Sequence, residues 1–177
     1  MSLTNEIKQK LSATIDKAVA GEDAIPGTTV VIFAKDGSEL FVKSAGKRGV
    51  LTNEPMTPDS IFWLASCTKM LTGLACMQLV ERGVLKLDDA AQTEGFCPEW
   101  RDLKVLTPTG ELVEKKNAIT LRMLLTHTAG FGYSFFSDRL RDWGYPVGIE
   151  EFSGDMADIM QPLLFQPGEG WQYGVSK

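Results

Sequence analysis

Residues 60–69 read Ser-Ile-Phe-Trp-Leu-Ala-Ser-Cys-Thr-Lys, and a mainly apolar run follows them as far as Arg82. Between Ser66 and Arg82 the apolar residues leave little room for a polar helix face. A helix that is apolar nearly all round is normally buried, and a glycine such as Gly83 is a natural stop for one. This stretch therefore predicts a buried helix with Ser66 in its first turn.

Ser66 and Lys69 are the residues of this helix that have the chemistry of a nucleophile and its activator. Three residues apart on a helix, they lie on one face about one turn apart. A serine in the first turn lies where the helix dipole and free N–H groups stabilise negative charge. A lysine in an apolar, partly desolvated position has a lowered pKa and is able to accept the hydroxyl proton.

The four-residue motif alone is weak evidence, because Ser-x-x-Lys usually marks a helix N-cap followed by a solvated lysine. Lys69 lies in the least polar stretch of the chain, where a solvated lysine is badly placed, and this favours the catalytic interpretation. The neighbouring Cys67 points to another face of the helix and is interpreted as a core residue.

The sequence before this helix predicts a helix and a β-hairpin. Apolar residues recur at helical spacing over residues 3–20, and Gly21 follows them. The β-branched stretch 28–34 and residues 39–44 predict two strands, and Asp36-Gly37 between them is a hairpin turn signal.

The sequence after this helix predicts a second, smaller hairpin over residues 104–113, broken at residues 107–110. Thr120 is placed to cap a short helix over residues 121–125. The remainder is rich in glycine and proline and is expected to be mostly loop.

Composition and charge exclude several classes of function. The net charge of −5 and the dispersed lysines and arginines argue against nucleic acid or an anionic membrane as partner. The N-terminus has no apolar core of the kind that a signal peptide needs, and no apolar run in the chain is long enough to span a membrane. Three cysteines without a framework spacing favour reduced thiols, and hence a cytoplasmic protein.

The single histidine, His127, limits the chemistry further. One histidine and scattered cysteines exclude a His-rich metal site. A Ser-His-Asp hydrolase would have to use His127, and no Gly-x-Ser-x-Gly elbow accompanies it.

Two further stretches follow residues 60–69 in order: Ile119-Thr-Leu-Arg-Met-Leu-Leu-Thr-His-Thr-Ala-Gly130 and Pro162-Leu-Leu-Phe-Gln-Pro-Gly-Glu-Gly-Trp-Gln-Tyr173. With these three motifs, residues 5–177 closely resemble the serine β-lactamase-like superfamily. The branch that they resemble contains class C β-lactamases, DD-peptidases, family VIII carboxylesterases and transesterases.

The resemblance implies an acyl-enzyme mechanism and a set of site residues. Ser66 is similar to the acylated nucleophile, Lys69 to its general base, and Tyr173 to the tyrosine that passes the proton to the leaving group. His127 takes the place of a structural histidine. Tyr133 and Trp171 are candidates to line the acyl or alcohol pocket, with plain packing as the alternative. The family needs no metal or organic cofactor, and the implied ligand is a small-molecule ester.

The chain departs from the family pattern in two places. The second motif, Tyr-x-Asn in β-lactamases and DD-peptidases, is Tyr173-Gly-Val175 here, so the amide that grips antibiotic or peptide side chains is missing. The third motif, Lys-Thr-Gly or a relative, is not reached. These departures favour a serine esterase or acyltransferase over a β-lactamase or DD-peptidase. A non-catalytic relative that acts as a binding protein is the second alternative.

The fold implied by the resemblance is α/β, an antiparallel sheet flanked by helices with an inserted, mostly helical region. Residues 1–60 would supply the first helix and strands, and residues 61–177 the nucleophile helix and part of the helical region. The closing strands are expected in a missing C-terminal part of the same protein. The isolated segment is therefore expected to expose apolar surface and to be inactive.

Overall fold

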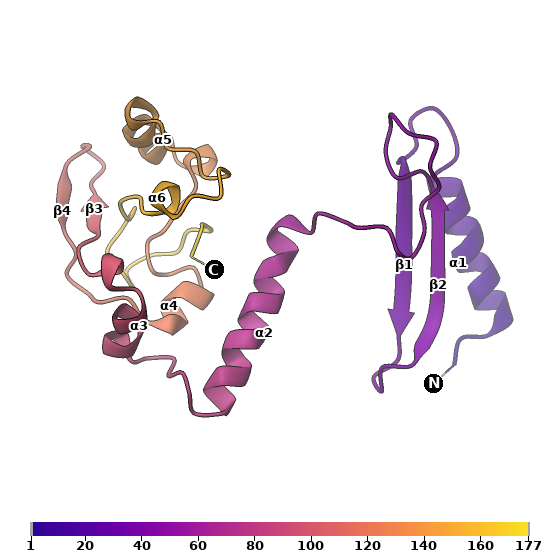
Figure 1. Cartoon of the computed structure of the whole chain (residues 1–177), viewed down its shortest axis with the longest axis horizontal. Coiled ribbons are helices and arrows are strands. Elements are labelled where there is room, and N and C mark those ends of the chain that lie inside the picture. The colour runs from indigo at the N-terminus through magenta and orange to yellow at the C-terminus, as the bar shows by residue number, and fades with distance from the viewer. Residues whose placement is uncertain (1, 177) are drawn as a thin grey trace. The chain divides into compact units, whose positions relative to one another are not determined.

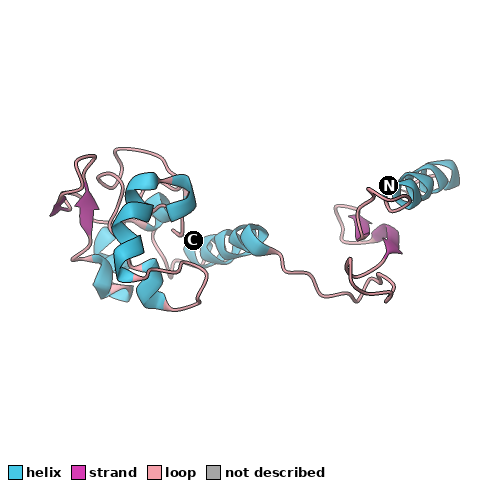
Figure 2. Ribbon diagram, turned by 90° about the horizontal axis from the view of Figure 1, so that it is seen from above, coloured by secondary structure: helices cyan, strands magenta, loops and turns pink. Residues whose placement is uncertain are grey.

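The computed structural model describes residues 2–176 and divides the chain into two compact units, Met1–Trp63 and Leu64–Lys177. The first unit consists of a helix and a two-stranded sheet (Figure 1). Short helices and loops make up most of the second unit (Figure 2). Helices with antiparallel strand pairs confirm the predicted mixed α/β class.

The first unit contains α1 (Asn5–Ala18), β1 (Gly27–Phe33) and β2 (Glu39–Gly46). Thr4 caps α1, since its Oγ1 accepts a hydrogen bond of 3.3 Å from the Ile7 amide. The two strands form an antiparallel hairpin, in which Val31 lies opposite Val42. The sequence prediction of a helix followed by a hairpin is therefore confirmed.

The helix and the hairpin of this unit are held together by a small apolar contact and one ion pair. Ile15 of α1 and Phe41 of β2 are the buried residues of these elements. The Lys43 ammonium lies 2.8 Å from the Asp16 carboxylate across the same interface.

The second unit begins with a 3₁₀ turn, Ala65–Cys67, and continues into α2 (Thr68–Glu81). The remaining elements are short: α3 (Ala90–Phe96), β3 (Lys104–Leu106), β4 (Leu112–Glu114), α4 (Leu121–Leu125), α5 (Asp138–Gly144) and α6 (Met156–Ile159). The pairing of β3 with β4 confirms the smaller hairpin. Thr120 caps α4 as predicted, because its Oγ1 accepts from the Met123 amide at 3.2 Å.

The prediction that the nucleophile helix is buried is wrong for this chain. No residue of α2 is buried, and Met70 is 73% exposed. Cys67, interpreted as a core residue, is exposed as well. A helix that is apolar all round needs cover on every side, and residues 2–176 leave most of its apolar side chains in contact with solvent.

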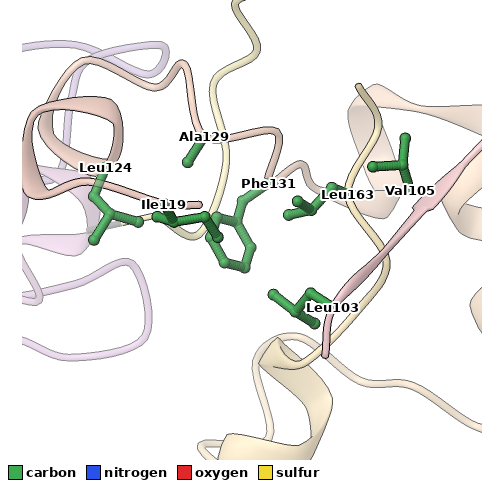
Figure 3. Packing of buried hydrophobic residues seen from close by; sticks show 7 residues of the cluster. All are labelled: Leu103, Val105, Ile119, Leu124, Ala129, Phe131 and Leu163. Atoms are coloured by element: carbon green, nitrogen blue, oxygen red, sulfur yellow. The ribbon is translucent and has the colours of Figure 1, made fainter. Parts of the chain in front are cut away.

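The hydrophobic core of the second unit contains no residue of α2 and is built from residues later in the chain. Figure 3 shows its buried cluster of Leu103, Val105, Ile119, Leu124, Ala129, Phe131 and Leu163. Leu163 connects this cluster to β3 through backbone hydrogen bonds of 2.8 Å in both directions, to Lys104 and Leu106. The next residue, Leu164, donates at 2.7 Å to the Gly130 carbonyl, so the loop after α4 is fixed to the same core.

A buried ion pair is bonded to Ile119, one of the residues of this core. The Lys115 ammonium contacts the Glu94 carboxylate, and the two side chains are 6% and 13% exposed. Glu94 also accepts a hydrogen bond of 2.9 Å from the Ile119 amide. Burial raises the pKa of Glu94, but the bonds from Lys115 and Ile119 outweigh it and hold that pKa below its ordinary value.

Among residues 2–176, no helix has both the length and the apolar character needed to cross a lipid bilayer.

Candidate active site

Ser66 lies in the 3₁₀ turn that leads into α2, at an exposed position. The residue before it, Ala65, has a φ of 45°, in the left-handed region that non-glycine residues rarely adopt. Such a conformation costs about 1–2 kcal/mol and is found most often at functional sites. The chain thus accepts backbone strain at the residue that presents the candidate nucleophile.

Lys69, in the first turn of α2, is brought together with two tyrosines from distant parts of the sequence. Its Nζ donates to the Tyr133 hydroxyl at 3.1 Å. The same Nζ lies 5.1 Å from the centroid of the Tyr173 ring and 5.6 Å from that of Tyr133. The two tyrosine rings are 5.8 Å apart, centroid to centroid. Lys69, Tyr133 and Tyr173 therefore form one cluster.

Ser66 is not joined to this cluster by a hydrogen bond. Its Oγ has no hydrogen-bond partner among residues 2–176, and Lys69 is directed toward Tyr133. On a helical turn, residues three apart have their Cβ atoms about 5–6 Å apart, so the hydroxyl and the ammonium share a face. The Ser66 hydroxyl is thus exposed beside the cluster.

The expectation of a lowered pKa for Lys69 is wrong for this structure. Burial lowers the pKa, but hydrogen bonding to the hydroxyls of Tyr133 and Tyr173 raises it more, and the net direction is upward. Burial is the largest single influence on this pKa, and it is outweighed only by the contributions of the two tyrosines taken together. Lys69 is therefore an ammonium at neutral pH.

His127 holds the segment that carries Tyr173. The His127 backbone carbonyl accepts from the Gln172 amide at 3.1 Å, and its Nδ1 accepts from the Gly174 amide at 3.4 Å. Ser176 Oγ lies 2.9 Å from the same Nδ1. The imidazole is buried against the Tyr173 ring, with centroids 4.7 Å apart. This geometry gives His127 a structural contact on both sides of Tyr173.

Gly174 allows the Tyr173 segment to approach the segment before Tyr133. A Cβ at position 174 would lie 2.5 Å from the Phe131 carbonyl oxygen and 2.8 Å from the Gly132 Cα. A larger residue would separate the two backbones. The absence of a side chain at Gly174 is thus one reason why Tyr133 and Tyr173 reach the same lysine.

Tyr133 has a role here that its sequence position does not reveal. The sequence made Tyr133 a candidate for pocket lining, with plain packing as the alternative, and in the structure its hydroxyl is the hydrogen-bond partner of Lys69. Its ring stacks on Phe135, with centroids 4.7 Å apart, and lies parallel to that of Phe152 at 6.3 Å. Lys69 and Tyr133 are 64 residues apart, and no local pattern indicates this contact.

Trp171 is placed differently from the other candidate residues. Its indole is 65% exposed and packs edge-on against His127, with centroids 6.4 Å apart. It therefore lies near the Tyr173 segment, on the His127 side.

Removing the Tyr133 hydroxyl is expected to lower the pKa of Lys69. In Tyr133→Phe the burial of Lys69 stays while one of the hydrogen bonds that raise its pKa is lost. Titration of the Lys69 side chain by NMR measures the change. Tyr145→Phe, which alters a tyrosine that is 82% exposed, is the matched control. An unchanged Lys69 titration in Tyr133→Phe would contradict this assignment.

The described residues 2–176 contain no arrangement of side chains that could bind a metal ion. No group of three or more His, Cys, Asp or Glu side chains is arranged there to hold an ion.

Several curated proteins of similar sequence are named as acyltransferases or esterases. The acyltransferase mokF of Monascus pilosus is 32% identical over 98% of this chain and 44% of its own length. The lovastatin esterase of Penicillium rubens is 33% identical over 91% of this chain and 42% of its own length. Esterase EstB of Burkholderia gladioli is 34% identical over 94% of this chain and 42% of its own length. The chain thus spans less than half the length of these relatives.

Solved structures of similar fold agree with the sequence relatives. The unliganded simvastatin synthase (LovD) of Aspergillus terreus has a TM-score of 0.81 at 28% identity, covering 98% of this chain and 46% of that one. EstCE1, a hydrolase with promiscuous acyltransferase activity, has a TM-score of 0.72 at 24% identity, covering 95% of this chain and 44% of that one. At this identity the likeness shows a shared fold and nothing more. The sequence model of the beta-lactamase family matches residues 11–176. With nearly all of its residues matched, this chain belongs to the beta-lactamase family.

Proposed function

We propose that this chain carries the nucleophile part of a serine esterase or acyltransferase that works through an acyl-enzyme. The observation that carries the proposal is the cluster of Lys69, Tyr133 and Tyr173 one helical turn from the exposed hydroxyl of Ser66. Relatives of similar sequence that are named as acyltransferases and esterases support it.

In the proposed reaction, Ser66 Oγ attacks the carbonyl carbon of an ester. Its proton passes to the free-base form of Lys69, and the alkoxide of the leaving alcohol receives a proton through Tyr173. The acyl group remains on Ser66 until water or a second alcohol takes it. The Ser66 backbone N–H would supply one donor of the oxyanion hole, and one such donor contributes about 2.7–4 kcal/mol in a comparable site.

Lys69 is expected to limit the rate by its protonation. Because its pKa is raised, only a small fraction is free base at neutral pH, and that fraction grows about tenfold per pH unit below the pKa. We therefore expect kcat/KM for an ester to rise steadily into the alkaline range. A plateau reached near pH 6.5–7 would indicate a histidine base and contradict the assignment.

Lys69→Arg is expected to reduce ester turnover by at least about 10²-fold, the usual scale for a lost general base. Arginine keeps the positive charge but does not lose its proton in proteins. His127→Asn should cost far less, since His127 contacts the Tyr173 segment as a structural residue. Steady-state kinetics on p-nitrophenyl butyrate rank the two variants, and the reverse ranking would favour a histidine-based mechanism.

Position 175 bears on the choice between esters and β-lactams. Val175 packs against the buried hydrophobic cluster of the second unit and has no amide to bind the side-chain amide of a penicillin or peptide. A missing hydrogen bond of this kind costs about tenfold in binding or more. The absent contact leaves ester chemistry unaffected, because that chemistry needs only the nucleophile, the proton relay and the oxyanion hole.

Turnover of p-nitrophenyl butyrate and of nitrocefin by the complete protein tests the proposed function. We expect kcat/KM for the ester to exceed that for nitrocefin by at least about tenfold. Comparable values would favour a β-lactamase or DD-peptidase. Turnover of neither substrate, together with no covalent adduct, would favour a non-catalytic relative.

Three further elements of the proposal concern the whole protein. Its substrate is a small-molecule carboxylic ester, and neither nucleic acid nor membrane is a partner. A C-terminal part of the same protein completes the fold, as the greater length of the relatives supports. A cytoplasmic location is supported by the three cysteines, which are all free thiols.

A further inference from the structure

Lys69 Nζ has two tyrosine oxygens as hydrogen-bond acceptors, one from each of two distant segments. It donates to the Tyr133 hydroxyl at 3.1 Å, and a second hydrogen bond joins it to the Tyr173 hydroxyl. The two rings lie 5.8 Å apart, centroid to centroid, so one nitrogen reaches both. The proposed reaction uses Tyr173 as a proton donor and gives the hydroxyl of Tyr133 no part.

The Tyr133 hydroxyl is held in place by its surroundings. The ring packs against Phe135 and Phe152, at centroid distances of 4.7 and 6.3 Å. The next residue, Ser134, donates to the Glu151 carboxylate through both its amide and its hydroxyl, at 2.7 and 2.8 Å. Because the side chain and the adjoining backbone are both restrained, Tyr133 offers Lys69 an acceptor at a fixed position.

Tyr173 is restrained in a similar way by His127. The His127 backbone carbonyl accepts from the Gln172 amide at 3.1 Å, and its Nδ1 accepts from the Gly174 amide at 3.4 Å. The neighbours of Tyr173 on both sides are thus bonded to one buried residue. Two acceptors at fixed positions therefore define two directions around Lys69 Nζ.

These two directions determine where a neutral Lys69 points its lone pair. A free-base amine has two N–H donors and one lone pair, arranged tetrahedrally with its carbon. When both N–H groups point to the tyrosine oxygens, one direction remains for the lone pair. Without Tyr133, one N–H loses its acceptor, and the lone pair turns with rotation about the Cε–Nζ bond. Ser66 lies three residues before Lys69, on the same face of the turn.

We propose that Tyr133 is a positioning residue, which together with Tyr173 directs the lone pair of free-base Lys69 toward Ser66 Oγ. The Ser66 proton passes to this lone pair as the bond from Oγ to the ester carbon forms, and the carbonyl π electrons move to the carbonyl oxygen. Tyr133 accepts a hydrogen bond throughout and transfers no proton. The inference rests on the proposed function and adds to it a residue that aims the base.

A role limited to raising the pKa of Lys69 predicts the opposite effect at neutral pH. Loss of the Tyr133 hydroxyl lowers that pKa, which increases the free-base fraction about tenfold per pKa unit. The weaker base accepts a proton less readily, but by a smaller factor. Removing a hydroxyl that acted only on the pKa would therefore speed the reaction of Ser66. Removing a positioning residue slows it, because a misplacement of about 1 Å costs about 10²-fold.

The rate at which a fluorophosphonate labels Ser66 at pH 7 separates the two roles. In this reaction the bond from Oγ to phosphorus forms, the phosphorus–fluorine bond breaks, and the serine proton passes to Lys69. Fluoride leaves without a proton from Tyr173, so the rate reports the activation of Ser66. We expect the complete protein with Tyr133→Phe, which keeps the ring, to be labelled at least about tenfold more slowly than the unaltered protein. An equal or faster rate would overturn the inference.

Two further variants distinguish positioning from other causes of a slower rate. Tyr145→Phe removes the hydroxyl of a tyrosine that is 82% exposed and should leave the rate unchanged. Tyr133→O-methyltyrosine keeps an oxygen acceptor and lacks the hydroxyl proton, so it should be labelled at nearly the unaltered rate. If it were as slow as Tyr133→Phe, Tyr133 would be passing on a proton, and the inference would be wrong.

Failure of this inference is distinguishable from failure of the proposed function. An unaltered protein that is not labelled at Ser66 would contradict both. Labelling of the unaltered protein with no loss of rate in Tyr133→Phe would contradict the role of Tyr133 alone. Urea denaturation of Tyr133→Phe should give a midpoint close to that of the unaltered protein, since the packed ring is retained.

Discussion

Replacing Ser66 with alanine is expected to abolish ester turnover and covalent labelling by a fluorophosphonate. Removal of the nucleophile of a serine hydrolase costs on the order of 10⁶-fold in kcat, because no other group takes over its role in the covalent step. Mass spectrometry of the labelled, digested protein should find the adduct on the peptide that contains Ser66. The measurement is direct, since the exposed position of Ser66 gives the reagent access to its Oγ.

Ser12→Ala is the control for this experiment, because Ser12 is a half-buried serine of α1, in the other compact unit, whose hydroxyl donates to Asp16 at 3.5 Å. It should leave both labelling and turnover unchanged. Labelling that persists undiminished in Ser66→Ala would show that another residue is the nucleophile.

Glu94→Ala is expected to lower the free energy of unfolding by about 3–5 kcal/mol, the range for breaking a buried ion pair. The substitution leaves the Lys115 ammonium, 6% exposed, without its carboxylate, and the Ile119 amide without its acceptor. Urea denaturation measures the change. Glu6→Ala removes one partner of a pair in which both side chains are 75% exposed, and should alter stability little.

The same carboxylate makes stability depend on pH. Because the pKa of Glu94 is lowered in the folded chain, its contribution is complete above the unfolded value of 4.5 and is lost as the pH falls through the folded value. Denaturation curves of the unaltered protein and Glu94→Ala should therefore converge on acidification. If the difference in unfolding free energy between the two proteins stayed constant down to pH 3, the pH dependence would not come from the Glu94 carboxylate.

The elements predicted best are those whose signals are local. The Asp36-Gly37 turn and the Thr120 cap each depend on residues that lie next to the structure they start, and both predictions are confirmed. The region expected to be loop contains α5, capped by Ser137, whose Oγ accepts from the Leu140 amide at 3.3 Å. A helix of two turns between glycines gives too short a periodic pattern to be recognised.

Burial and pKa were harder to predict because they depend on distant parts of the chain. The apolar run of α2 shows that the helix suits a buried place, but burial also requires a neighbour to cover it. Likewise, an apolar stretch around Lys69 suggested a lowered pKa, and two tyrosine hydroxyls from residues 133 and 173 reverse the direction. The resemblance to a family indicated Tyr173, whereas the contact between Tyr133 and Lys69 appears only in three dimensions.

The backbone conformation of His127 limits the amino acids that position 127 tolerates. Its φ of 59° lies in the left-handed region, and its side chain must also offer an acceptor to Gly174. Glycine satisfies the first requirement without the second, and a β-branched residue fails the first. Asparagine is enriched in that backbone region and carries a side-chain oxygen. Saturation mutagenesis at this site would therefore rank substitutions by two separable criteria, and asparagine and aspartate are replacements that meet both.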